Sequence, residues 1–128
     1  MAFYWAASCG GCEIAVLDMN ERILDLVQHV DIVFWPVAMD VKYRDVEAFP
    51  DGYVDVTFFN GSVRNSEQEH MANVLRAKSK LLVAFGSCAN EGSVPGLANL
   101  HDAQDILDHV YMEVSQGRGN GSAVPRPD

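Results

Sequence analysis

Basic residues, cysteines and long apolar runs are all scarce in this sequence of 128 residues. Lys and Arg number 9 against 18 Asp and Glu, for a formal net charge of −9. Such a surface repels nucleic acids and anionic membranes, which argues against both as partners. No apolar run approaches the roughly 20 residues that a membrane-spanning helix needs. The three cysteines are too few and odd in number for a disulfide scaffold, so we expect a reducing, cytoplasmic setting.

Apolar runs alternate with amphipathic helical patterns along most of the chain. The patterns predict buried strands at 2–7, 31–37, 54–61 and 80–86, and helices at 12–27, 66–78 and 102–114. This alternation is typical of an α/β fold in which helices cover both faces of a parallel sheet. Right-handed crossovers then predict a flavodoxin-like three-layer α/β/α fold, with four parallel strands in the order 2-1-3-4.

The length suits one domain with a sizeable core, which we expect to span residues 1–114. Trp5 and Trp35 fall in predicted strands and are expected in that core. The start of the chain lacks a charged segment and cleavage site, so no signal peptide is expected. Residues 115–128 turn to a Gly-, Asn- and Ser-containing composition and are expected to form a flexible tail or a truncated linker.

The three cysteines each follow a predicted strand. Cys9 and Cys12 lie in Ser-Cys-Gly-Gly-Cys-Glu after the first strand, and Cys88 lies in Gly-Ser-Cys-Ala-Asn after the fourth. The carboxyl ends of parallel strands share one edge of a sheet, so we expect the three thiols to meet there.

Several backbone groups around these thiols are candidates for binding a cofactor. Gly10 and Gly11 allow amides to turn toward the sulfurs, and a helix that begins near Cys12 favours anionic thiolates. Ser87 and the amide of Ala89 offer further hydrogen bonds, which tune the potential of a bound redox centre.

The residues by themselves leave several interpretations open. An iron–sulfur cluster suits three clustered thiolates, although such clusters usually take four cysteines. A thioredoxin-like dithiol needs only Cys9 and Cys12, and structural thiols need no partner. A zinc site needs a further ligand, for which His101 is the only nearby histidine in sequence, and we expect it on the surface.

Taken together, the two motifs resemble the N-terminal domain of [NiFe]-hydrogenase small subunits. The resemblance covers residues 1 to about 112, includes Pro-Gly-Leu at 95–97, and is greatest to the cytoplasmic viologen- and F420-reducing group. It implies an electron-transfer subunit in an anaerobic oxidoreductase complex, with Cys9, Cys12 and Cys88 as three of the four ligands of a proximal [4Fe-4S] cluster. It also implies two partners, a large catalytic subunit with the nickel–iron centre and a further electron-acceptor subunit, and no catalytic residue on this chain.

Two features depart from the family's pattern. The family's fourth ligand lies in a later Cys-Pro motif, whereas this sequence has no cysteine after Cys88. We therefore expect that the C-terminal part is lacking; a [3Fe-4S] cluster, a non-cysteine ligand or a clusterless docking domain are the alternatives. The family's proton-relay glutamate stands two residues after the second cysteine, whereas Glu13 follows Cys12 directly. Glu13 is thus a weak relay candidate, and equally a first-turn helix carboxylate.

The related subunit of complex I typically carries adjacent cysteines. The separation of Cys9 from Cys12 therefore favours the hydrogenase-type subunit over that relative. An iron–sulfur subunit of a redox complex that no longer handles hydrogen remains an alternative.

Overall fold

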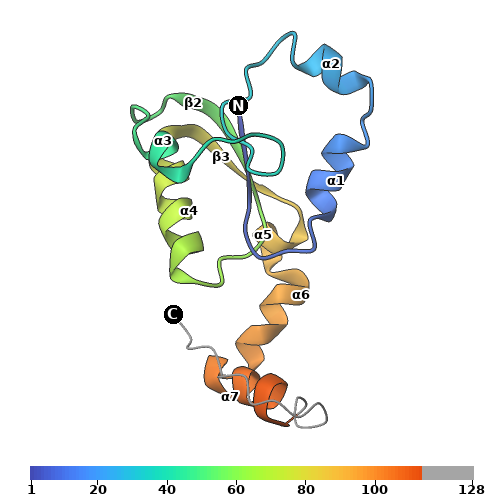
Figure 1. Cartoon of the computed structure of the whole chain (residues 1–128), viewed down its shortest axis with the longest axis vertical. Coiled ribbons are helices and arrows are strands. Elements are labelled where there is room, and N and C mark those ends of the chain that lie inside the picture. The colour runs from blue at the N-terminus through green and yellow to red at the C-terminus, as the bar shows by residue number, and fades with distance from the viewer. Residues whose placement is uncertain (114–128) are drawn as a thin grey trace.

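The computed structural model describes residues 1–113, with a small parallel sheet at their centre (Figure 1). In chain order the elements are β1 (Ala2–Trp5), α1 (Gly11–Leu17), α2 (Arg22–Leu26), α3 (Tyr43–Glu47), β2 (Val54–Asn60), α4 (Ser66–Lys78), β3 (Ser79–Phe85), α5 (Ser87–Glu91), α6 (Ser93–Gly96), a 3₁₀ turn (Leu97–Leu100), α7 (Ala103–Asp108) and a π turn (His109–Glu113). No helix within this range is both long and apolar enough to cross a membrane.

The sheet contains three parallel strands in the order β1-β2-β3, with Tyr4 opposite Phe59 and Phe59 opposite Ala84. The predicted α/β class and parallel sheet are therefore confirmed. The predicted four-stranded 2-1-3-4 order is not formed. Residues 31–37 lie beside β1 but pair with it through one isolated bridge, between Ala2 and Phe34.

The fourth strand stops short because its backbone turns away after Phe34. The carbonyl of Trp35 accepts a hydrogen bond from the amide of Ala38 at 2.9 Å, which closes a turn instead of extending the ladder. Pro36 follows and has no N–H to offer a neighbouring strand. A short apolar run that ends in proline thus lies in place at the sheet edge without becoming a strand.

One face of the sheet is packed against α4. Tyr4 and Phe59 contribute to the main core from the strands, and Met71 and Leu75, one helical turn apart, contribute from α4. The helix begins where the sequence predicts, because the side chain of Asn65 accepts a hydrogen bond from the amide of Gln68 at 3.0 Å.

The long helix predicted over 12–27 is wrong. Two short helices, α1 and α2, replace it, and Asn20 between them takes a left-handed conformation with φ of 50°. Asparagine tolerates this conformation better than most residues. The break leaves side chains that were expected to face the core exposed; they are Ile14, Leu17, Leu24 and Val27.

The opposite face of the sheet carries a row of aromatic rings. The ring of Phe3 lies 4.6 Å from Trp35 and 5.3 Å from Phe58, centroid to centroid. Figure 1 shows α1 on this side of the sheet, and α3 and α4 on the other. The predicted core position of Trp35 is confirmed, but that of Trp5 is wrong, because Trp5 is 41% exposed.

The region after β3 is more helical than its glycines indicate. Two short helices, α5 and α6, and a 3₁₀ turn run away from the sheet toward α7 (Figure 1). The helix predicted over 102–114 forms as α7 followed by a π turn, with Ile106 and Leu107 half-buried and Val110 exposed. The predicted tail at 115–128 lies outside the described residues.

Candidate functional site

The two cysteine-bearing loops meet at the carboxyl edge of the sheet. Cys9 is exposed in the loop after β1, Cys12 lies in the first turn of α1 and Cys88 in the first turn of α5; all three are free thiols. The loop from β1 to α1 runs beside α5 (Figure 1). The contact is close, because a Cβ placed on Gly86 would lie 2.2 Å from the sulfur of Cys12. The juxtaposition of the two loops expected from the strand order is therefore present.

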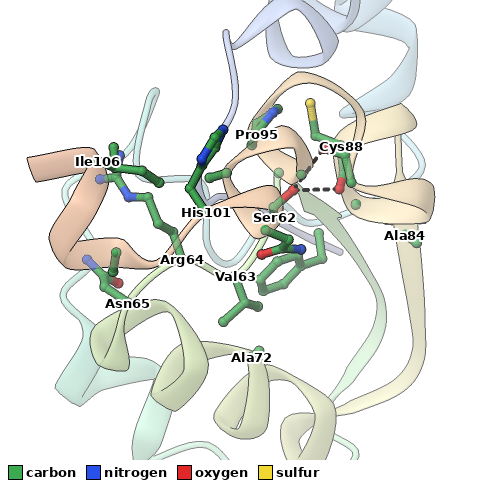
Figure 2. A pocket seen from close by; sticks show the side chains of 18 of the residues that line it. Ser62, Val63, Arg64, Asn65, Ala72, Ala84, Cys88, Pro95, His101 and Ile106 are labelled. Carbon is green, nitrogen blue, oxygen red and sulfur yellow. Dashed lines mark hydrogen bonds between the residues drawn. The ribbon is translucent and has the colours of Figure 1, made fainter. Parts of the chain in front are cut away.

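A third loop ties the two cysteine loops together. Ala7 and Ser62 exchange backbone hydrogen bonds of 3.1 and 2.9 Å, which join the loops after β1 and β2. The hydroxyl of Ser62 then donates to the carbonyl of Cys88 at 2.8 Å and reaches that of Gly92 at 3.3 Å. Figure 2 shows both bonds, with the Cys88 sulfur pointing away from Ser62. Sequence reasoning missed Ser62, whose signal was its place just after a strand.

The loop between Cys9 and Cys12 is held in a tight turn. Gly10 takes a left-handed conformation with φ of 80°, and its amide donates to the hydroxyl of Ser8 at 3.2 Å. The amide of Gly11 donates to the sulfur of Cys9 at 3.4 Å. Hydrogen bonds of this kind stabilise a thiolate over a thiol. On the other loop, Ser87 is exposed at the start of α5 and Ala89 is half-buried.

Glu13, next to Cys12, is buried beneath the loop with 1% of its surface exposed. The indole N–H of Trp35 donates to its carboxylate. The second carboxylate oxygen of Glu13 and the amide of buried Asn60 meet no hydrogen-bond partner of full geometry within residues 1–113. Burial raises the pKa of Glu13 above its usual value, and the nearby Trp35 and Asn60 side chains offset part of that rise. Glu13 is thus not the solvated first-turn carboxylate of the simpler interpretation.

The buried carboxyl group of Glu13 predicts a pH-dependent stability. Because its pKa in the folded chain is raised, protonation of Glu13 favours folding. This contribution is complete below the unfolded pKa of about 4.3 and is lost as pH rises through the higher folded value. We expect the free energy of unfolding of the iron-free chain, relative to that of Glu13→Gln, to fall over that window. Urea unfolding of both proteins at several pH values measures this difference, and a difference independent of pH contradicts the prediction.

A cavity of about 960 Å³ lies on the far side of the Ser62–Cys88 contact. Its walls come from α4, from the loop after β2 and from the α6–α7 region (Figure 2). Arg64 and His101 face it together with apolar residues such as Ile106. The loop of Cys88 therefore separates this open space from the side on which its sulfur points.

The thiols fit a cluster better than a single ion. Within residues 1–113, no three His, Cys, Asp or Glu side chains are grouped closely enough to hold one metal ion. This argues against the zinc interpretation, which needs four ligands around one atom. An iron–sulfur cluster binds each cysteine through a different iron, so its ligand sulfurs stand farther apart. Three free thiols on adjoining loops, with glycines that leave room beside the sulfurs, match that requirement.

Comparison with known proteins identifies the family. Residues 9–119 match the family described as NADH ubiquinone oxidoreductase, 20 kDa subunit. The chain belongs to this family. The family takes its description from the complex I subunit, but the individual relatives are hydrogenase subunits. The chain is 41% identical over 128 residues to the iron-sulfur subunit of the F420-non-reducing hydrogenase of Archaeoglobus profundus, covering 99% of this chain and 40% of that protein.

Other relatives give the same picture at greater distance. The chain is 33% identical to a subunit of the F420-non-reducing hydrogenase of Methanothermobacter thermautotrophicus, covering 97% of this chain and 39% of that one. In a crystal structure of an NAD⁺-reducing [NiFe]-hydrogenase, one chain superposes with a TM-score of 0.82 at 30% identity, over 98% of this chain and 65% of that one. The resemblance to [NiFe]-hydrogenase small subunits is therefore confirmed. The chain spans about two fifths of the length of the two curated relatives from Archaeoglobus and Methanothermobacter.

Proposed function

We propose that this chain is the electron-transfer subunit of a [NiFe]-hydrogenase-type complex. Cys9, Cys12 and Cys88 would be ligands of its proximal [4Fe-4S] cluster. The observation that carries the proposal is the close approach of the Cys12 sulfur to Gly86, two residues before Cys88. Two loops far apart in sequence thereby present their thiols at one edge of the sheet. The partners would be a large catalytic subunit and an electron-acceptor subunit, in the cytoplasmic, anaerobic setting expected from the sequence.

A cluster bound here would supply one-electron transfer between the partners. The residues of this chain would set its environment. Gly11 directs its amide at the Cys9 sulfur, and Gly10 provides the turn that makes this possible. Ser87 and Ala89 would offer hydrogen bonds from the Cys88 loop. Such bonds favour the more negatively charged state and raise the reduction potential.

Glu13 is the proposed proton-relay residue. Its buried carboxyl group has one oxygen held by Trp35 and a second that faces no partner of full hydrogen-bond geometry within residues 1–113. A carboxyl group in such a place can exchange a proton without competing water.

Replacement of each cysteine in turn tests the proposal. The host would produce Cys9→Ser, Cys12→Ser and Cys88→Ser variants, each purified anaerobically with its partners. Iron, acid-labile sulfide and low-temperature EPR are then measured. Each variant is expected to lose most of its iron, because serine oxygen is a poor ligand for these clusters. His101→Asn, which changes an exposed side chain, is the control and is expected to keep its iron.

The result for Cys88→Ser separates the alternatives. Full iron in this variant would contradict a site that includes Cys88. If the wild-type protein held no iron and Cys9 and Cys12 equilibrated with thioredoxin, the chain would be a thiol–disulfide module. If Cys9→Ser left assembly and electron flow unchanged, the chain would be a docking domain.

A further inference from the structure

The indole of Trp5 lies over the loop that joins Cys9 to Cys12. Trp5 is the last residue of β1, and its side chain leaves the sheet on the same face as that of Phe3. A Cβ placed on Gly10 would lie 2.5 Å from Cζ2 and 2.6 Å from Cη2 of Trp5. The six-membered edge of the indole therefore rests directly against the backbone of Gly10.

This contact accounts for the unusual burial of Gly10. Its neighbours Cys9 and Gly11 are exposed, yet Gly10 is buried. Trp5 itself remains 41% exposed, so its ring covers the loop without being enclosed by the core. A large side chain in this position adds little to the core and much to the environment of one turn.

The contact also restricts the conformation of the turn. Gly10 has φ of 80°, and the amide of the next residue, Gly11, donates to the Cys9 sulfur. A rotation of the Gly10 backbone would move that amide away from the sulfur. The indole blocks part of the space into which the loop would move, because it occupies the position next to the Gly10 Cα.

We propose that Trp5 is a positioning residue for the Cys9–Cys12 loop. Its indole holds Gly10 in the left-handed turn and screens one side of the loop from water. The inference rests on the proposed function, because its effect is measured on the bound cluster. Without the indole, the loop is freer to release a ligand and more water reaches the sulfurs. Water stabilises the more negatively charged reduced state, so the reduction potential rises.

The test compares Trp5→Ala and Trp5→Phe with the wild-type protein, each purified anaerobically from the host in its native assembly. Two quantities are measured: the rate at which an iron chelator removes iron, and the reduction potential by EPR-monitored titration. We expect Trp5→Ala to lose iron about five-fold faster, the factor that loss of one aromatic contact allows. Its potential should shift upward, and Trp5→Phe should give intermediate values.

Tyr53→Ala is the matched control. Tyr53 is an aromatic residue of similar exposure, 53%, and it lies before β2, at the opposite end of the sheet from the cysteines. It should match the wild-type protein in both measurements.

The outcomes separate this inference from the proposed function. If the wild-type protein binds no iron, the proposed function fails. If it binds iron and Trp5→Ala has the same release rate and potential, only the role of Trp5 is overturned. A Trp5→Ala protein with a native circular dichroism spectrum and no iron supports the proposal. A Trp5→Ala protein with the spectrum of an unfolded chain overturns it, because Trp5 would then act through the whole fold.

Discussion

Replacing Gly86 with alanine is expected to lower the iron content of the protein by more than about ten-fold, the loss expected when a ligand is displaced. The new Cβ would lie 2.2 Å from the sulfur of Cys12, far inside any contact that atoms adopt. The backbone of Gly86, with φ of 86° and ψ of 169°, also lies in a region that is essentially restricted to glycine. To relieve both problems, either Cys12 turns its sulfur away or the start of α5 shifts with Cys88.

The matched control for this change is Gly96→Ala. Gly96 ends α6 in ordinary helical geometry, and a Cβ placed on it meets no atom within 4 Å. It should bind iron like the wild-type protein. Iron and sulfide assays on anaerobically purified protein measure both variants. A Gly86→Ala protein with wild-type iron content and an unchanged EPR spectrum would show that the two loops do not bind a common group.

Replacing Gly61 with alanine should cost about 2–4 kcal/mol in the free energy of unfolding, from backbone strain and overpacking together. Gly61 has φ of 98°, and its Cβ would lie 2.8 Å from the carbonyl carbon of Ala6 and 2.9 Å from the amide of Ala7. These are backbone atoms of the segment that pairs with Ser62, so they cannot rotate aside. The substitution would push apart the loops that position the cysteines.

Gly52→Ala separates the effect of conformation from that of crowding. Gly52 also has a positive φ, of 69°, but the nearest atom to its Cβ would be the flexible Lys80 side chain at 3.8 Å. It should cost only about 1–2 kcal/mol, the strain of a left-handed residue. Urea unfolding of both variants measures the difference. Equal losses for Gly61→Ala and Gly52→Ala would contradict the close loop contact.

The sequence predicted the parts of the fold that depend on local pattern. The helix at 66–78 begins at its Asn65 cap and buries Met71 and Leu75, as its spacing indicates. Three of the four expected strands form in parallel, because each is a continuous apolar run. The order of the strands places the loops of Cys9, Cys12 and Cys88 at one edge, which the contact of Cys12 with Gly86 bears out.

The parts that failed depend on tertiary context. The apolar spacing over 12–27 could not reveal that Asn20 would take a left-handed conformation and break the helix. The apolar character of Trp5 indicated a core position, but the end of β1 places the ring over a loop. Nor could the sequence show that Trp35, 22 residues after Glu13, would donate to its buried carboxylate. Such contacts follow only once the strands are assembled.

The most direct test of the central claim is Mössbauer spectroscopy of the ⁵⁷Fe-labelled protein, purified anaerobically, together with its iron and sulfide content. In a complex with other clusters, the signal is assigned by its loss in Cys88→Ser. The account predicts about four irons per chain in the spectrum of one [4Fe-4S] cluster, all lost when Cys88 is replaced. An iron-free protein, or iron that survives unchanged in Cys88→Ser, would contradict it.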